Sequence, residues 1–161
     1  TTRFNAYLVD LKLELNRAMA TIHSRSGGTP PQVIVTGYYD LFPSKACEAI
    51  PEVTTTELQW LRNRNAALNR AISGTVAKYS FAKYAPVSFK GHELCTTDSW
   101  VQDNTAPMPF HPTATGQQKI ADAVMKYYKT PQVSQPTASS QSSSTSSYRE
   151  RALDIYQRLR R

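Results

Sequence analysis

Residues 107–118 read Pro-Met-Pro-Phe-His-Pro-Thr-Ala-Thr-Gly-Gln-Gln and place His111 between two prolines. Pro109 and Pro112 fix their own φ angles and disfavour the helical region for the residue before each of them. We therefore expect His111 on a stiff loop. Imidazole is the side chain best suited to proton transfer near neutral pH, which makes His111 a candidate general base. For an isolated histidine, the alternative is that the ring only fills a gap in the loop.

A helix is predicted directly after this loop. Thr115 and Gln118 have the spacing of a capping box. Apolar residues then recur at helical intervals, at Ile120, Ala121, Val124, Tyr127 and Tyr128. Lys129 lies two residues before Pro131, so we expect the helix to end near Lys129.

The chain before the histidine loop alternates between helical and strand patterns. Residues 3–24 carry an apolar stripe at helical spacing, and residues 33–35 form a short β-branched run between breakers. A second capping box at Thr54 begins a helical pattern that we expect to reach about Tyr84, and residues 86–89 are a second strand candidate. This order predicts an α/β fold, a parallel sheet covered by helices on both faces. Sites in such sheets form at the carboxyl ends of the strands.

Length and composition favour one domain. The chain has 161 residues and a net charge of +7, from 19 Lys and Arg against 12 Asp and Glu. No run resembles a signal peptide or a membrane span, and no nucleic-acid motif accompanies the charge. Because the first residue is Thr rather than Met, we expect a cleaved or excised piece of a longer protein.

Composition divides the chain into three parts. Residues 1–130 carry the helical and strand patterns and form the predicted domain. Residues 131–147 are rich in Ser, Thr, Pro and Gln, which is typical of a flexible linker. Residues 148–161 form a basic amphipathic tail, a helix candidate that could make peripheral contact with acidic surfaces.

The two cysteines, Cys47 and Cys95, lie in predicted loops on either side of the long helix. Neither belongs to a Cys-x-x-Cys pair or has metal-type histidine spacing, so no metal site is expected. From the residues alone they are either a disulfide, formed in an oxidising compartment, or two free thiols.

Three sequence blocks follow one another along the chain. They are Val-Ile-Val-Thr-Gly-Tyr-Tyr-Asp-Leu-Phe-Pro at residues 33–43, Phe-Lys-Gly-His-Glu-Leu-Cys at residues 89–95 followed by Trp-Val at 100–101, and His-Pro-Thr-Ala-Thr-Gly-Gln-Gln-Lys-Ile-Ala at residues 111–121. Together they resemble the SGNH (GDSL-type) hydrolases, in particular secreted actinobacterial lipases and esterases. The resemblance implies a flavodoxin-like three-layer fold, of which this chain would hold the C-terminal half. It also implies secretion, no cofactor, and a disulfide between Cys47 and Cys95.

In the family, the histidine of the last block activates a nucleophilic serine, so the resemblance implies that His111 is the general base. The Gly-Asp-Ser block that carries the serine and the Gly-x-Asn-Asp block that supplies oxyanion donors are both absent from this chain. Many members place Asp three residues before the histidine, where this chain has Met108. Some members instead orient the histidine with a backbone carbonyl near that position, so the resemblance implies that the carbonyl of Met108 or Pro109 orients His111. Asp98 or Asp103 is the side-chain alternative.

Tyr38, Phe42 and Trp100 are the candidate substrate-binding side chains. Packing is the alternative role for each of them, and for Trp100 it means packing against the His111 loop. His92 is expected to fix the loop before Cys95. The predicted function is an ester hydrolase of lipase or esterase type, acting on ester or lipid substrates and not on nucleic acid. The alternative is a non-catalytic hydrolase-like fragment, or an interaction module with a basic tail.

Overall fold

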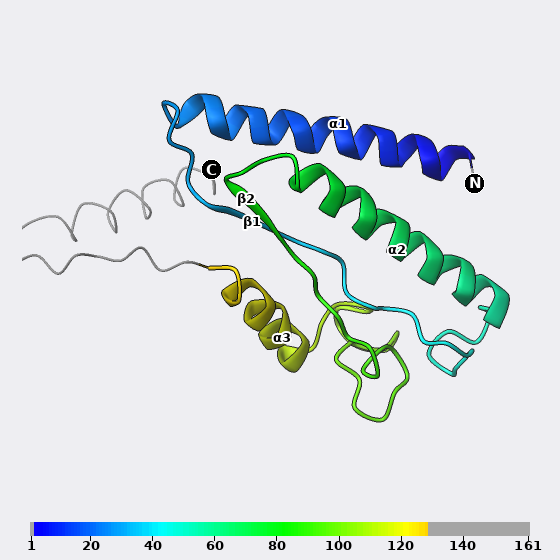
Figure 1. Ribbon diagram of the computed structural model, residues 1–161. Helices are drawn as coiled ribbons and strands as arrows, with labels where there is room; N and C mark the ends of the chain where they lie inside the picture. Colours follow the sequence, from blue (N-terminus) through cyan, green and yellow to red (C-terminus); the bar gives the residue numbers. More distant parts are fainter. Residues whose placement is uncertain (1, 129–161) are drawn as a thin grey trace, which may run out of the picture. The chain divides into compact units, whose positions relative to one another are not determined.

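The structure is a computed structural model that describes residues 2–128 (Figure 1). Its elements follow one another as α1 (Thr2–Arg25), β1 (Val33–Thr36), α2 (Thr55–Val76), β2 (Ala82–Ala85) and α3 (Ala114–Met125). The linker predicted at residues 131–147 and the tail predicted at 148–161 lie outside the described residues. The predicted division of the chain into three parts therefore stays a prediction.

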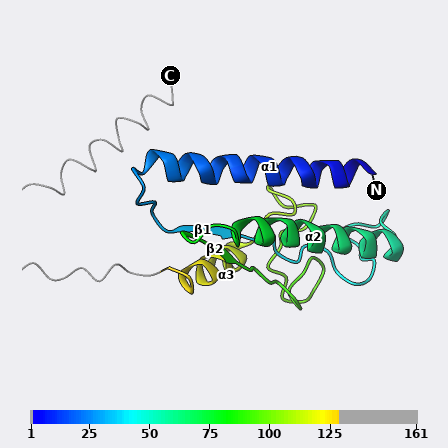
Figure 2. The same ribbon diagram turned by 45° about the horizontal axis from the view of Figure 1, so that its top comes forward.

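The two strands form a parallel sheet between helices. β1 pairs with β2 in a register that places Val33 opposite Ala82 and Thr36 opposite Ala85. Figures 1 and 2 show α1 and α2 along one side of the strands and α3 on the other. The predicted parallel α/β arrangement of three layers is confirmed. Within residues 2–128 the sheet has two strands, so each strand has one edge that pairs with no other described strand.

The helix predicted at residues 3–24 is confirmed as α1, which packs mainly against α2. Met19 is only 2% exposed and packs in one core cluster with Ile72, Val76 and Ala82. Burying a side chain of this size contributes about 1.5–3 kcal/mol. The Tyr79 hydroxyl adds a polar link to α1, because it donates to Asn16 Oδ1 at 2.8 Å.

The capping box at Thr54 is confirmed, since the Thr54 hydroxyl accepts from the Glu57 N–H and the Glu57 carboxylate accepts from the Thr54 N–H. The predicted end of this helix near Tyr84 is wrong, because α2 ends at Val76 and Tyr84 lies in β2. Turn hydrogen bonds from the Lys78 and Tyr79 N–H groups to the Thr75 and Val76 carbonyls replace the helical pattern there.

The strand predicted at residues 86–89 is also wrong, because β2 ends at Ala85. Val87 and Phe89 are nevertheless buried while Pro86 and Ser88 are exposed, so the alternation of burial is that of a strand. Two polar groups of this segment bond to one carboxylate. Asp40 Oδ2 accepts from the Ser88 hydroxyl at 2.7 Å and from the Phe89 N–H at 3.1 Å.

The helix after the histidine begins earlier than predicted. Thr113, not Thr115, is the N-cap of α3, and its hydroxyl accepts from the Gly116 N–H at 3.2 Å. The helix ends at Met125 rather than near Lys129, which lies beyond the described residues. α3 packs over a second core cluster, made up of Val87, Phe89, Leu94, Val101 and Ala123.

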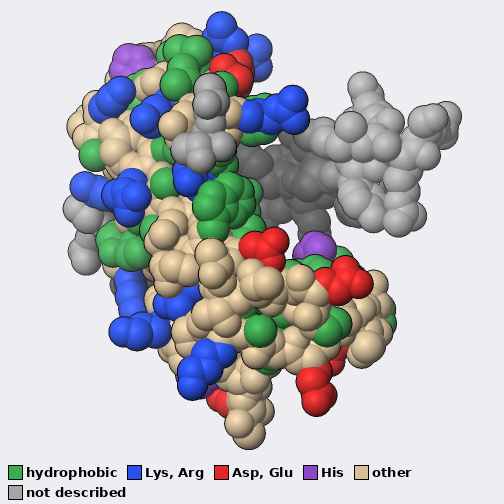
Figure 3. Space-filling view, turned by 90° about the vertical axis from the view of Figure 1, so that its right-hand side faces the viewer, with side chains coloured by type: hydrophobic (Ala, Val, Ile, Leu, Met, Phe, Trp, Pro, Cys, Tyr) green, Lys and Arg blue, Asp and Glu red, His purple; other side chains and the backbone are tan. Residues whose placement is uncertain are grey.

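Acidic and basic side chains are distributed differently on one face of the molecule. On the face shown in Figure 3, Asp and Glu side chains lie mostly in the lower half, whereas Lys and Arg side chains lie across the upper half and continue down the left edge. None of the helices within residues 2–128 has the length and apolar character needed to span a bilayer.

Candidate active site

His111 presents an exposed imidazole whose Nδ1 lies 3.0 Å from the carbonyl oxygen of Pro109. A carbonyl can only accept, so Nδ1 carries the proton of this hydrogen bond, and Nε2 of the neutral ring is left with a free lone pair. The other candidate carbonyl, that of Met108, accepts from the His111 backbone N–H at 3.3 Å instead. Of the two carbonyls predicted to orient the ring, the structure therefore places Pro109 at Nδ1. A catalytic role for this contact stays a prediction.

The loop that carries His111 is paired with residues 101 and 102. Val101 and Pro112 form an isolated antiparallel bridge. The Gln102 N–H donates to the His111 carbonyl at 2.8 Å, and the Phe110 N–H donates to the Gln102 carbonyl at 2.9 Å. The Gln102 side chain adds a bond to the Pro112 carbonyl at 3.1 Å. Residues 101–102 and 110–112 thus form a short two-stranded ribbon that holds the backbone of His111, although the imidazole ring is exposed.

The start of α3 is hydrogen-bonded to the residue that precedes this ribbon. The Thr113 N–H donates to the Trp100 carbonyl at 2.8 Å. Gly116 is buried at this contact, and a methyl group on it would overlap the Trp100 carbonyl oxygen and lie 3.2 Å from Phe89 Cε2. Only a residue without Cβ allows α3 to approach so closely. This role of Gly116 was not predictable from local sequence, and its place in the third block is the signal that the sequence offers.

Two asparagines on α2 secure the segment that follows β1. Asn69 accepts from the Tyr38 N–H and donates to the Tyr38 carbonyl, both at 2.8 Å. One turn earlier, Asn65 donates to the Tyr39 carbonyl at 2.9 Å. The Tyr39 hydroxyl in turn donates to the Phe110 carbonyl at 2.8 Å, next to His111. Sequence reasoning missed these contacts, because nothing local marks an asparagine in a helix as a backbone clamp.

Neither candidate carboxylate is bound to His111. Asp98 lies at His92, whose Nδ1 is 3.1 Å from Asp98 Oδ2 and 2.8 Å from the Asp98 carbonyl. Asp103 Oδ1 closes a turn by accepting from the Thr105 hydroxyl at 2.7 Å and from its N–H at 2.9 Å. These hydrogen bonds, that of the Thr105 side chain first, lower the pKa of the Asp103 carboxyl.

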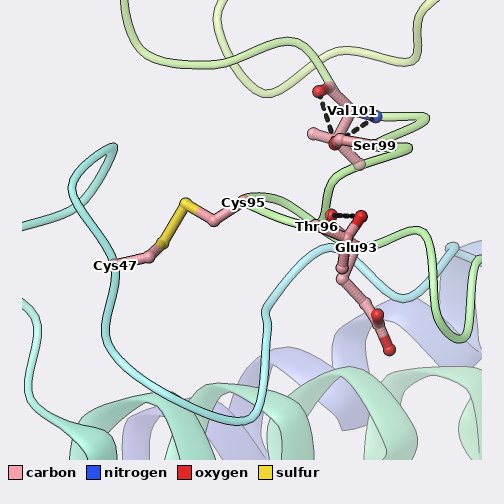
Figure 4. Close-up of a disulfide and its surroundings, with 6 residues drawn as sticks. All are labelled: Cys47, Glu93, Cys95, Thr96, Ser99 and Val101. Atoms are coloured by element: carbon pink, nitrogen blue, oxygen red, sulfur yellow. Dashed lines mark hydrogen bonds between the residues drawn. A yellow bond between two sulfur atoms is a disulfide. The ribbon is translucent and has the colours of Figure 1, made fainter.

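The disulfide implied by the family resemblance is confirmed: Cys47 and Cys95 are bonded, with their Cα atoms 6.2 Å apart (Figure 4). It joins the loop after β1 to the loop that leads into the ribbon. Further along that loop, the Ser99 hydroxyl donates to the Val101 carbonyl at 2.8 Å and accepts from the Val101 N–H at 3.1 Å. The covalent link therefore braces the chain just before the ribbon that holds His111.

The three candidate substrate side chains lie in different surroundings. Tyr38 is 58% exposed at the end of β1. Phe42 lines a cavity of about 1040 Å³ between α2 and residues 90–93, whose described lining includes neither Trp100 nor His111. The half-buried Trp100 ring stacks on His92 at 3.7 Å and meets the edge of Phe89 at 5.4 Å. Trp100 therefore adjoins the histidine loop through its backbone, and a role in substrate binding stays a prediction for all three.

The fold and the site together define a class. A parallel α/β domain carries a histidine on a braced loop directly before α3, as the motifs of the SGNH hydrolases imply. Among residues 2–128, no group of three or more His, Cys, Asp or Glu side chains is placed to hold a metal ion.

Two crystal structures of Streptomyces enzymes are similar to this chain. An extracellular lipase from Streptomyces rimosus is 26% identical, with a TM-score of 0.64 over 77% of this chain and 53% of the lipase chain. A phospholipase A1 from Streptomyces albidoflavus is 26% identical, with a TM-score of 0.65 over 78% of this chain and 56% of that chain. No protein-family model and no curated protein matches the chain. The resemblance to SGNH-type hydrolases is thereby confirmed. The chain spans just over half the length of each enzyme.

Proposed function

We propose that this chain is the base-bearing part of a secreted ester hydrolase that uses an acyl-serine mechanism, with His111 as general base and then general acid. The observation that carries the proposal is the hydrogen bond between His111 Nδ1 and the Pro109 carbonyl, which leaves an exposed Nε2. Its setting supports the same reading, because similar folds belong to a lipase and a phospholipase A1. Ester or lipid substrates follow from that likeness, and the disulfide is in keeping with secretion.

In the proposed mechanism, Nε2 takes the proton of a serine hydroxyl as its oxygen attacks the ester carbonyl. The imidazolium that forms is stabilised by the Pro109 carbonyl at Nδ1–H. It returns the proton to the departing alcohol, which leaves an acyl-serine. Water then attacks the acyl group with Nε2 as base, and the acid and the free serine are released. No cofactor enters these steps.

The serine and the oxyanion donors are proposed to come from outside residues 1–161, because the sequence contains no Gly-Asp-Ser or Gly-x-Asn-Asp block. The short segment Gly37-Tyr38-Tyr39-Asp40 has similar spacing, but a Tyr side chain cannot supply the amide donor of the family's Asn. The missing nucleophile also supports the second candidate function, a hydrolase-like module whose role is association rather than catalysis.

The test compares the chain alone with the chain joined to an upstream segment that carries both absent blocks. Alone, residues 1–161 should not hydrolyse short-acyl p-nitrophenyl esters above the rate of exposed histidines. The joined protein should be active, His111→Ala should abolish most of that activity, and His23→Ala on α1 should retain it as the matched control.

Asp98→Asn and Asp103→Asn should also retain activity in the joined protein, because the Pro109 carbonyl already occupies Nδ1 of His111. Losing the group that orients a catalytic histidine can lower the rate by about four orders of magnitude, so a large drop in either variant would contradict the carbonyl role. Serine-dependent turnover by the isolated chain would refute the proposal itself. It would indicate a nucleophile among Ser73, Ser80, Ser88 and Ser99.

A further inference from the structure

Phe110, directly before His111, has a left-handed backbone with φ of 65°. This conformation costs a non-glycine residue about 1–2 kcal/mol and persists where its surroundings hold it. Among the described residues, the other non-glycine residue with positive φ is Cys95, which is anchored by its disulfide. Phe110 has no covalent anchor, so its hydrogen bonds must hold the turn.

The Phe110 carbonyl receives one such bond, from the Tyr39 hydroxyl at 2.8 Å. The Tyr39 ring stacks on the fully buried Phe89, with ring centres 4.5 Å apart and planes inclined by 22°. Burial, followed by the nearby Tyr38 phenol, raises the pKa of Tyr39, so its hydroxyl keeps the proton that it donates at neutral pH. The donor is therefore both correctly protonated and fixed in direction by its ring.

The backbone of Tyr39 is also held by side chains of α2. The carboxamides of Asn65 and Asn69 bind the backbone of residues 38 and 39 through three hydrogen bonds of 2.8–2.9 Å. The backbone of Tyr39 is therefore bonded to α2, and its hydroxyl is bonded to the peptide group that precedes the imidazole.

We propose that Tyr39 is a positioning residue for His111. Its hydroxyl holds the Phe110 carbonyl in the left-handed turn, and this turn keeps the Pro109 carbonyl opposite Nδ1 and leaves Nε2 unprotonated. The proposal rests on the proposed function for its catalytic meaning, because a lone pair on Nε2 matters only if His111 is a base. The geometric part, control of the imidazole tautomer, is independent of any turnover.

Tyr39→Phe in the full 161-residue chain tests this directly, because it removes the hydroxyl and leaves the stacked ring in place. The readout is the tautomer of neutral His111, from the ¹⁵N chemical shifts of its ring. The wild type should hold the proton on Nδ1, and the variant should show a mixture with the Nε2-protonated form. Losing a hydrogen bond worth about 1 kcal/mol should also speed amide exchange of Phe110 and His111 by about fivefold.

The matched control is Tyr84→Phe. Tyr84 is another half-buried tyrosine with a raised pKa, and its hydroxyl makes no hydrogen bond within residues 2–128. This variant should leave the His111 tautomer unchanged, and the His92 ring serves as internal reference in both spectra. Asn65→Ala, which frees the Tyr39 carbonyl, should shift His111 in the same direction as Tyr39→Phe.

An unchanged His111 tautomer and unchanged amide exchange in both Tyr39→Phe and Asn65→Ala would overturn the proposal. That result is distinct from a failure of the proposed function, which is judged by the hydrolysis lost in His111→Ala. If the joined enzyme is active, Tyr39→Phe should also lower kcat more than it changes KM, and the Asn65→Ala variant should follow it.

Discussion

Gly116→Ala tests whether α3 must lie in close contact with Trp100 and Pro112, next to His111. In an exposed helix position, replacing Gly by Ala stabilises by about 0.5–1 kcal/mol. At Gly116 the new methyl group would overlap the Trp100 carbonyl and approach Pro112 Cβ to 3.0 Å. The Trp100 carbonyl cannot retreat without stretching its 2.8 Å bond from the Thr113 N–H. Overpacking of this kind typically costs about 1–3 kcal/mol, so the variant should be destabilised overall.

Gly74→Ala supplies the matched control. Gly74 lies in α2 with an ordinary helical backbone, and a methyl group there meets no atom within 4 Å. It should therefore gain the full helix-propensity benefit. Urea unfolding of the two variants, followed by tryptophan fluorescence, should separate them by about 1–3 kcal/mol, the overpacking cost itself. Equal stabilisation by both substitutions would refute the close approach of α3 to Trp100.

Two further predictions concern the braces of the fold. Replacing both Cys47 and Cys95 by Ala should lower the free energy of unfolding by about 2–4 kcal/mol, and reductant should cause a similar loss in the wild type but none in the variant. Two thiols found by Ellman titration of the denatured, unreduced protein would contradict it. Hydrogen bonds from Thr54, the backbone first and then the hydroxyl, lower the pKa of Glu57 from its ordinary 4.5. The stabilisation that this carboxylate contributes is therefore present above pH 4.5 and is lost as the pH falls through the lowered pKa. Glu57→Gln should therefore reduce the pH dependence of the urea unfolding midpoint between about pH 5 and pH 3.

The elements that local sequence determines were predictable. The stripe of α1 and the capping box at Thr54 depend on residues within a few positions of one another, and the structure has both. The end of α2 does not depend on local sequence. Tyr79 and Tyr84 continue the helical spacing, and they do pack on the core shared by α1 and α2, but from a turn and from β2. Pairing with β1, far away in the chain, determines the conformation of residues 82–85.

The start of α3, next to His111, also depends on contacts with residues distant in the sequence. Two threonines can cap this helix, and Thr115 has the better partner in sequence because Gln118 completes a capping box. Thr113 is the cap because its N–H binds the Trp100 carbonyl and Pro112 pairs with Val101. The choice depends on a segment that precedes the helix by more than ten residues. His111 itself was identifiable from its block, whereas Tyr39 and Gln102 act through contacts that no motif records.

The two edges of the sheet that pair with no strand within residues 2–128 differ in how another chain can meet them. β1 is Val-Ile-Val-Thr, with no proline or charge to discourage a further strand. β2 carries the exposed Lys83 and is followed by Pro86, two features that disfavour strand addition. Two copies that meet through β1 would make a four-stranded sheet bounded on both sides by β2. Strand addition at β1 would therefore end at a symmetric pair and would not continue into a fibre.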